Sequence, residues 1–327
     1  MEVLIEARHV RKSFGSLIAV DDLQLQIAEG EIYGLIGPDG AGKTTTMRLL
    51  CGGLTPDSVR SGVSDGKPLI RIAGYDLEHK PEQARSQIGY LAQRFSLYEE
   101  LTVLENIRFF AEMRGLQAAE WRPRCLAILE FVGLASFQDR RAGQLSGGMK
   151  QKLGLAAALV HQPRVLLLDE PTTGVDPVTR QDFWQLIIRL VGESRSDGKR
   201  TVVFISTPYM DEAARCSRVG FMQYGRMILE GTPAALRSRL DGRIIELVGK
   251  PLMLIRRIAQ EDTDVRMVQM FGDRLHIHTQ PDQTEIVLER LIGAITSQGG
   301  QVVSIRMVPP GLEDVFMDLL QANRESI

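Results

Sequence analysis

Two short segments carry residue types that suit the binding and cleavage of a phosphate chain. The run Gly37-Pro-Asp-Gly-Ala-Gly-Lys43-Thr44 fits the pattern G-x-x-x-x-G-K-[ST], whose glycines let backbone N–H groups approach phosphates closely. We expect Lys43 to hold the β and γ phosphates and Thr44 to ligate magnesium. Downstream, Val165-Leu-Leu-Leu-Asp169-Glu170 predicts a buried strand that ends in two carboxylates. There Asp169 can hold the magnesium shell, and Glu170 can orient or deprotonate an attacking water.

A second glycine-rich turn opens another helical stretch, at Leu145-Ser146-Gly147-Gly148-Met149. It also could offer N–H groups and a hydroxyl to a phosphate. Because one site scarcely needs two such cradles, we infer that this turn serves the nucleotide of a second subunit. The working unit would then be a head-to-tail dimer with two shared sites.

Hydrophobic periodicity predicts the elements that must position these residues. An α/β fold with a mainly parallel sheet is indicated, because strands alternate with helices, and a helical subdomain is expected from about 94 to 160. A capping box at Thr102 opens one of its helices. Strands are expected at 4–10, 19–27, 31–36, 165–169 and 201–206, and helices at 43–51, 102–113, 125–132 and 178–191.

The last part of the chain has a different order of elements. Strands are predicted at 243–248, 265–270, 274–279 and 301–307, and helices at 252–260 and 285–297. This β-α-β-β-α-β order is ferredoxin-like. A length of 327 residues also favours two domains, so we expect one at 1–238 and a small C-terminal α+β domain at 239–327.

Together the motifs resemble the nucleotide-binding subunit of an ABC transporter over about residues 3 to 235. The resemblance rests on the P-loop, Leu-Ser-Gly-Gly, Leu-Leu-Leu-Asp-Glu-Pro and Gly-Val-Asp-Pro, in that order and spacing. It implies a P-loop NTPase cassette with a RecA-like parallel sheet core, an antiparallel β subdomain and a helical subdomain. Phe14 resembles the aromatic that stacks on adenine, Gln93 the glutamine that touches magnesium and the permease, and Val175-Asp176 the D-loop.

The site expected from the motifs and the resemblance uses ATP and Mg²⁺. Catalytic roles fall to Glu170, Gln93 and Lys43, and metal-binding roles to Thr44, Gln93 and Asp169. The nucleotide is expected to contact Phe14, Gly37, Pro38, Asp39, Gly40, Ala41, Gly42, Lys43, Thr44, Thr45, Ser146, Gly147 and Gly148.

Two further segments resemble the exporter branch of that family, Tyr98-Glu-Glu-Leu-Thr102 and Leu312-Glu-Asp-Val-Phe316. This resemblance implies a subunit that hydrolyses ATP to energise export by a separate transmembrane permease. Its partners would be that permease and a second cassette, identical or different, and it would lie on the cytoplasmic face of the membrane. The role of the C-terminal domain stays open, with packing as the simplest interpretation.

Two positions depart from the family pattern and bear on the same pocket. Pro208 stands where a histidine usually contacts the γ-phosphate, and loss of one such donor typically costs about 100-fold to 1000-fold in rate. Asp39 replaces Asn or Ser, and its carboxylate would repel phosphate unless protonated or paired. Our hypothesis is slow hydrolysis at this P-loop within a heterodimer. Two alternatives stay open: other groups position the water, or the chain is a regulatory half with little hydrolysis.

Composition and net charge argue against other classes of protein function. A net charge of -2 gives no basic field for nucleic acid, and the longest apolar runs are far short of the roughly 20 residues that span a bilayer. A soluble ABC protein of translation or DNA repair is disfavoured because tandem cassettes and long coiled coils are missing from the pattern. Three separated cysteines suggest neither disulfides nor zinc.

Several other residues are interpreted as structural. Trp121 and Trp184 are expected to be packing residues within helices. His276 and His278 alternate on one strand face and are expected to be solvated or paired. The stretch 58–67 looks like an insertion that forms a surface loop.

Overall fold

The computed structural model describes residues 2–57, 67–93, 97–194 and 197–325. The chain divides into two compact units, Met1–Glu230 and Gly231–Ile327, called here the N-terminal and C-terminal units. The sequence pattern placed the boundary after residue 238, but the structure places it earlier, after Glu230. The difference arises because α8 (Pro233–Arg237) packs against α11 (Leu312–Glu325) within the C-terminal unit.

A six-stranded sheet forms the centre of the N-terminal unit. Its neighbouring strands β6/β7, β7/β8, β8/β3 and β3/β9 are all parallel. The strands β3, β7 and β8 are buried along their whole length, which explains their near-continuous apolar sequences. The order across the sheet is β10 (Arg226–Gly231), β9 (Arg218–Gln223), β3 (Ile32–Ile36), β8 (Val202–Thr207), β7 (Val165–Asp169) and β6 (Ile88–Leu91).

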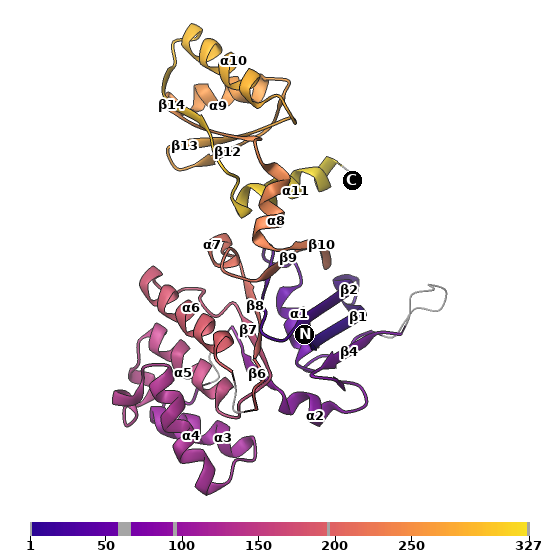
Figure 1. Cartoon of the computed structure of the whole chain (residues 1–327), viewed down its shortest axis with the longest axis vertical. Helices are drawn as coiled ribbons and strands as arrows, with labels where there is room; N and C mark the ends of the chain where they lie inside the picture. The colour runs from indigo at the N-terminus through magenta and orange to yellow at the C-terminus, as the bar shows by residue number, and fades with distance from the viewer. Residues whose placement is uncertain (1, 58–66, 94–96, 195–196, 326–327) are drawn as a thin grey trace. The chain divides into compact units, whose positions relative to one another are not determined.

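A second, antiparallel sheet shares the core of this unit. Its order is β2 (Leu17–Ala28), β1 (Val3–Phe14), β4 (Leu69–Ile72) and β5 (Tyr75–Asp76). The inward residues of β2 pack in one cluster with α1 (Lys43–Leu50) and with β7 and β8. In Figure 1, α1 and the antiparallel strands lie on the opposite side of β6, β7 and β8 from α5 and α6.

Helices make up most of the rest of the N-terminal unit. They are α2 (Pro81–Ser86), α3 (Val103–Met113), α4 (Ala118–Phe131), α5 (Gly147–Leu159), α6 (Pro177–Gly192) and α7 (Met210–Ala213). The expected capping box at the start of α3 is present, since Thr102 accepts from Glu105 N and Glu105 accepts from Thr102 N. Helical structure begins at Val103, later than the expected start near 94, because 97–102 form turns and loop.

The C-terminal unit follows the β-α-β-β-α-β order that periodicity predicts. Its elements are β11 (Ile244–Lys250), α9 (Leu252–Glu261), β12 (Val265–Phe271), β13 (Arg274–Thr279), α10 (Thr284–Ser297) and β14 (Gln301–Met307), followed by α11. The sheet order is β12-β13-β11-β14, with every neighbouring pair antiparallel. Apolar residues of α9 and α10 cover one face of this sheet.

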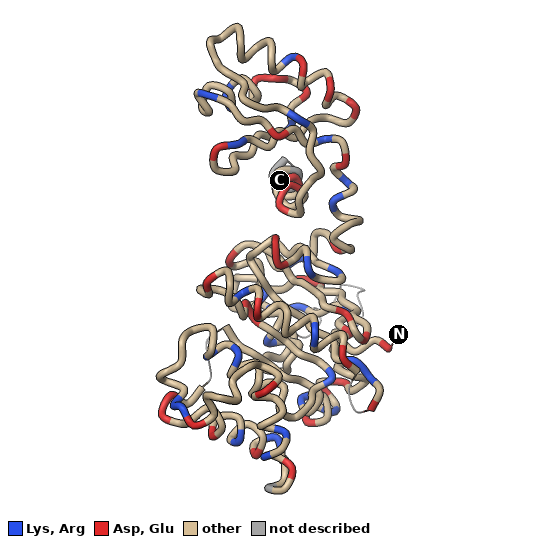
Figure 2. Tube along the Cα trace, turned by 60° about the vertical axis from the view of Figure 1, so that its left-hand side comes forward, with Lys and Arg blue, Asp and Glu red and all other residues tan. Residues whose placement is uncertain are grey.

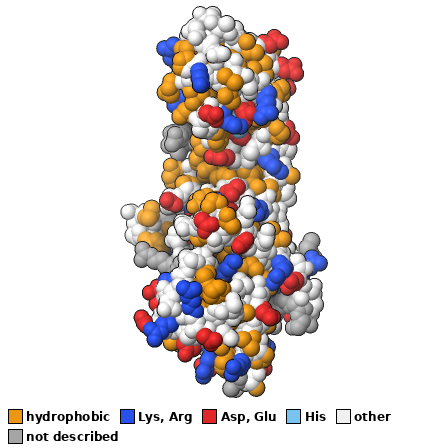
Figure 3. Space-filling view, turned by 90° about the vertical axis from the view of Figure 1, so that its left-hand side faces the viewer, with side chains coloured by type: hydrophobic (Ala, Val, Ile, Leu, Met, Phe, Trp, Pro, Cys, Tyr) orange, Lys and Arg blue, Asp and Glu red, His pale blue; other side chains and the backbone are white. Residues whose placement is uncertain are grey.

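Charge and packing of the surface agree with the near-neutral composition. Acidic and basic residues are intermixed along the traced part of both units (Figure 2), and both signs are interspersed over the helical part of the N-terminal unit (Figure 3).

Among the described residues, none of the helices has the length and apolarity to cross a membrane. All three cysteines are free thiols. Trp184 is buried and Trp121 partly buried, as expected of packing residues.

Candidate nucleotide site

The P-loop borders a pocket of about 350 Å³ at the carboxyl ends of the parallel strands. This is the edge of an open α/β sheet at which ligands commonly bind. Ten of the expected site residues line it, together with two that the motifs did not predict. The lining residues are Phe14, Leu17, Ala19, Asp39, Gly40, Ala41, Gly42, Lys43, Thr44, Thr45, Gln93 and Glu170.

Two glycines allow the P-loop to take its path. Gly42 has a φ of 110°, and a Cβ there would lie 2.2 Å from the carbonyl oxygen of Ala19. A Cβ at Gly37 would lie 2.2 Å from the carbonyl oxygen of Met222. The chain then enters α1, whose first N–H groups have no acceptor within the helix. These donors and the positive end of the helix suit a phosphate.

Lys43 is buried at the start of α1 and already has several partners. Its ammonium donates to the carbonyl oxygens of Gly37 at 2.9 Å and Pro38 at 3.2 Å. The same Nζ atom lies 3.3 Å from Oε1 of Glu170. The flexible ammonium therefore stands between the P-loop backbone and the second carboxylate of β7, where it can also reach a phosphate.

Asp169 ends β7 and is 1 % exposed. Its Oδ1 accepts from the hydroxyls of Ser206 at 2.8 Å and Thr44 at 3.2 Å. Burial raises the pKa of Asp169, while these hydrogen bonds act in the opposite direction. Among the described residues its Oδ2 has no hydrogen-bond partner. A buried carboxylate oxygen without a partner, beside the Thr44 hydroxyl, fits a hard cation such as Mg²⁺.

Glu170 follows in an unusual backbone conformation, with a φ of 47° that non-glycine residues rarely adopt. Its buried side chain points into the pocket, where Oε1 faces Lys43 and Oε2 accepts from Gln93 Nε2 at 3.0 Å. The hydroxyl of Thr173 donates to the same Oε2 at 3.4 Å. The carboxylate thus has a fixed direction, which a group that orients a water molecule requires.

The turn at Ser146 lies outside this pocket. Ser146 and Gly147 are exposed, and Ser146 caps α5 by accepting from Met149 N at 3.3 Å. Gly148 lies against α6, where a Cβ would come 2.2 Å from Cγ2 of Thr179. Ser146, Gly147 and Gly148, which were expected to contact a nucleotide, therefore do not line the pocket of their own chain. Asp176, in the D-loop, caps α6 through Val178 N and Thr179 N.

The aromatic expected to stack on adenine lies at a hairpin that borders the pocket. Phe14 pairs with Leu17 across the turn at 15–16, and the two side chains are 49 % and 65 % exposed. An apolar pair left in contact with solvent suits the face of a base. The motifs did not predict Leu17, although an apolar pair across a short turn was a detectable signal.

The two departures from the family pattern differ in their position. Asp39 is exposed and is one of the residues that line the pocket. Pro208 is exposed, directly follows β8, and is not among the residues that line the pocket. A proline has no side-chain donor, so this position contributes none to the pocket.

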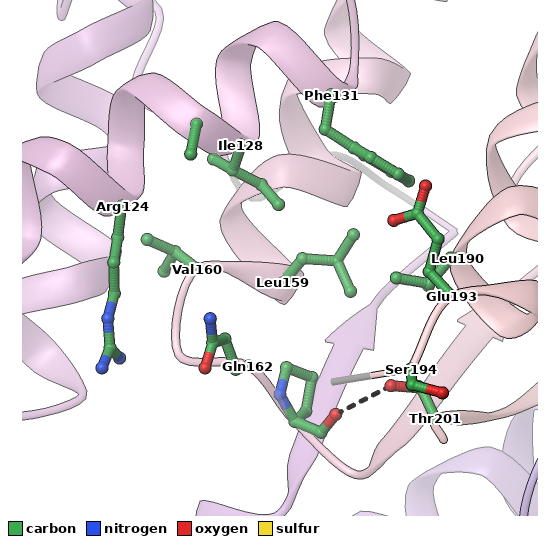
Figure 4. Close-up of a pocket in the computed structure, with 12 residues that line it drawn as sticks. Arg124, Ile128, Phe131, Leu159, Val160, Gln162, Leu190, Glu193, Ser194 and Thr201 are labelled. Atoms are coloured by element: carbon green, nitrogen blue, oxygen red, sulfur yellow. Dashed lines mark hydrogen bonds between the residues drawn. The ribbon is translucent and has the colours of Figure 1, made fainter. Parts of the chain in front are cut away.

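A second pocket, of about 230 Å³, lies between α4, α5 and α6 (Figure 4). Ile128, Phe131 and Leu159 line it, and the hydroxyl of Thr201 donates to the carbonyl of Pro163 at its edge, at 3.3 Å. The lining residues include no glycine-rich loop and no helix N-terminus. The P-loop pocket is therefore the stronger candidate for a phosphate ligand.

Comparisons with known proteins agree with this geometry. Residues 20–173 match the protein family described as ABC transporter. The chain is 41 % identical over 306 residues to a probable multidrug ABC transporter ATP-binding protein, YbhF, of Escherichia coli K12. That match covers 92 % of this chain and 49 % of the relative, so the chain spans about half the length of that protein.

Another relative matches along nearly its whole length. Nod factor export ATP-binding protein I of Rhizobium sp. strain N33 is 35 % identical over 324 residues, and the match covers 97 % of each chain. Among solved structures, the ATP-binding cassette MJ0796, dimeric and bound to ADP and Pi, is similar with a TM-score of 0.60. It is 26 % identical and covers 70 % of this chain and 98 % of its own.

Proposed function

The chain belongs to the ABC transporter family as an ATP-binding protein, and on that premise we propose that its P-loop pocket hydrolyses ATP to energise export by a separate membrane permease. The observation that carries this proposal is the buried Glu170 carboxylate, held between Lys43 and Gln93 inside the pocket. A carboxylate fixed beside a phosphate cradle is what water attack on a phosphoryl group requires.

In this proposal the phosphates lie over the start of α1. The N–H groups of the P-loop and Lys43 bind the β and γ phosphates, and Phe14 with Leu17 contacts the adenine. Thr44 and Asp169, with Gln93, would hold Mg²⁺, whose charge neutralises the phosphate oxygens when it is bound. The unpartnered Oδ2 of Asp169 supports this assignment.

Glu170 orients the attacking water and accepts its proton. The water oxygen forms a bond to the γ phosphorus, and the bond from that phosphorus to the β–γ bridging oxygen breaks. The products are ADP and inorganic phosphate. Lys43 stabilises the charge that develops on the phosphate oxygens, and Gln93 keeps the carboxylate of Glu170 directed at the water.

A second cassette would complete the site. Ser146 and Gly147 are exposed at the N-terminus of α5 and do not reach the pocket of their own chain, so they are free to bind the γ-phosphate held by a partner. The dimeric state of the related cassette MJ0796 supports a head-to-tail dimer for this chain. The partner cassette is identical or different.

We propose slow hydrolysis at this P-loop. Pro208 contributes no donor, and Asp39 adds a negative charge to the space that the phosphates would occupy. In a heterodimer, the intact turn at Ser146 would complete the faster pocket of the other cassette. The same two residues favour a second candidate function, a regulatory cassette that binds ATP and gates the permease with little turnover.

The names of the relatives suggest the class of transport. One is named a probable multidrug transporter protein and another a Nod factor export protein, so a drug or a compound of the Nod factor kind is the proposed cargo class. The permease would lie in the cell membrane with this chain on its cytoplasmic face. Selectivity would then reside in the permease.

Dimerisation tests the shared site. We expect Glu170→Gln, incubated with ATP and Mg²⁺, to form an ATP-dependent dimer on size exclusion. Adding Ser146→Arg to Glu170→Gln should abolish that dimer, while radiolabelled ATP still binds. Adding Ser86→Arg instead, on an exposed part of α2, should leave the dimer intact. An unchanged dimer with Ser146→Arg would contradict the head-to-tail arrangement. If Glu170→Gln on its own stays monomeric, a heterodimer is favoured. Ser146→Arg and Ser86→Arg are then compared in the presence of the partner cassette.

A further inference from the structure

Ser206 connects the carboxylate of Asp169 with the backbone of Glu170 in the proposed catalytic centre. It is fully buried on β8 and pairs with Asp169 in the parallel register of β7 and β8. Its hydroxyl donates to Oδ1 of Asp169 at 2.8 Å and accepts from the backbone N–H of Glu170 at 3.0 Å. A hydroxyl has one hydrogen and two lone pairs, so both bonds can be made at once.

Each of these bonds fixes a different part of the site. The bond to Oδ1 directs the carboxylate of Asp169 so that Oδ2 is the oxygen left without a partner. The N–H group of Glu170 donates to this hydroxyl and also to the backbone carbonyl oxygen of Ser206 at 3.2 Å. Both bonds hold the peptide at Glu170, whose φ of 47° is sparsely populated and must be maintained by its surroundings. The direction of the Glu170 side chain depends on that backbone conformation.

Ser206 acts on the reaction only through these neighbours, because it does not line the pocket. We infer that Ser206 is a positioning residue for ATP hydrolysis, whose single hydroxyl orients both the metal-binding carboxylate and the carboxylate that acts on water. The inference rests on the proposed roles of Asp169 and Glu170. No sequence motif singled it out, since its partners are distant in the chain.

Thr201, which directly precedes β8, offers a matched control. Its side chain is also buried, and its hydroxyl donates to the carbonyl oxygen of Pro163 at 3.3 Å (Figure 4). Thr201→Val removes a buried hydroxyl, as Ser206→Ala does, but neither Thr201 nor its partner Pro163 lines the P-loop pocket. If Ser206 has a purely structural role, Ser206→Ala and Thr201→Val should change kcat to the same extent.

The test compares kcat and KM for ATP, together with the Mg²⁺ concentration for half-maximal rate, in Ser206→Ala, Ser206→Thr and Thr201→Val. We expect Ser206→Ala to lower kcat by about 10-fold to 100-fold, because a small displacement of a catalytic group has effects of this size. KM for ATP should change less than about threefold, and the Mg²⁺ requirement should rise. Ser206→Thr keeps the hydroxyl and should recover most of kcat, while Thr201→Val should stay within about twofold.

Equal kcat values for Ser206→Ala and Thr201→Val would overturn the inference, as would a loss confined to KM. If Ser206→Ala does not fold, Ser206→Cys, which keeps the size but weakens both bonds, replaces it, and a kcat at the wild-type level would again overturn the inference. Failure of the proposed function is distinguishable, because Glu170→Gln would then retain turnover. If Glu170→Gln abolishes turnover and Ser206→Ala does not lower kcat, only the inference on Ser206 fails.

Discussion

Lys43 and Glu170 form a buried ion pair in the P-loop pocket, with Nζ of the lysine 3.3 Å from Oε1 of the glutamate. The cation proposed to hold the phosphates thus neutralises the carboxylate proposed to act on water. Phosphate oxygens would compete with Glu170 for this ammonium, which also donates to the Gly37 and Pro38 carbonyls. Nucleotide binding and the freeing of Glu170 are therefore coupled.

Removing both partners of this pair should cost less than the two single removals added together. We expect Lys43→Met to lower the free energy of unfolding without nucleotide by about 3–5 kcal/mol, because a buried carboxylate loses its cation. Lys43→Met with Glu170→Gln should cost less than the sum of the two single changes. Urea unfolding of the four proteins measures this difference. Strictly additive effects would show that the ion pair contributes nothing to the folded state.

Glu212 stabilises the segment that follows the catalytic carboxylate. It is 1 % exposed and accepts from the hydroxyls of Thr172 at 2.7 Å and Thr207 at 2.6 Å. Glu212→Ala leaves two buried hydroxyls without this acceptor, so we expect the free energy of unfolding to fall by about 2–4 kcal/mol. The exposed neighbour is the control: Asp211→Ala should stay within about 0.5 kcal/mol in the same urea titration. Similar losses for both variants would refute the bridging role.

A histidine in place of Pro208 should speed hydrolysis. The imidazole would add a donor toward the γ-phosphate, so we expect Pro208→His to raise kcat by about tenfold or more. Pro208→Ala relieves the proline backbone constraint and restores the backbone N–H without adding a side-chain donor, and it should leave kcat within about threefold of wild type. If both variants have the wild-type rate, the lack of a donor at this position does not limit turnover.

Stability of the C-terminal unit should depend on the protonation of His276. Its Nδ1 lies 2.9 Å from Oδ1 of Asp314 on α11, and the hydrogen bond to Asp314 raises the pKa of His276. Burial alone would raise the pKa of Asp314, but the bonds to His276 and His278 hold it well below its usual value. The other nitrogen of His276 lies 3.8 Å from Glu246. Glu246 also pairs with the guanidinium groups of the neighbouring strands, Arg274 and Arg306.

A group whose pKa is raised on folding stabilises the folded state fully below its unfolded pKa, here about 6.5. This stabilisation is lost as the pH rises through the higher pKa of the folded state. We expect hydrogen exchange of the α11 amides, corrected for the intrinsic rate, to become less protected over that pH range. His276→Gln should remove the pH dependence, and the exposed His79→Gln should preserve it. A pH dependence that survives His276→Gln would assign it to another group.

Local patterns predicted the parts of the fold whose signals lie within one segment. The P-loop, the strand that ends in Asp169 and the capping box at Thr102 each appear in the structure at the expected residues. Short elements such as β4, β6 and the hairpin β9–β10 were missed, because four to six residues give little periodicity. The stretch 58–67 lies almost wholly outside the described residues, so its proposed role as a surface loop stays a prediction.

Long-range contacts account for the site residues that the sequence did not reveal. Ser206 contacts Asp169 and Glu170 only because β7 and β8 are neighbours in the sheet. His276 and His278 are paired, as interpreted from their alternation, but their partner Asp314 comes from a helix that the pattern did not predict. Which parallel strands are adjacent is set by the tertiary fold rather than by local propensity.

Steady-state ATP turnover of the purified chain, measured beside Glu170→Gln with and without its membrane partner, tests the central claim most directly. The account predicts a slow but measurable phosphate release that Glu170→Gln reduces by at least about 100-fold, while ATP binding persists. Gln keeps the size of the side chain but cannot accept the proton from water. Equal phosphate release by the wild type and Glu170→Gln would contradict the assignment of Glu170 as the group that acts on water.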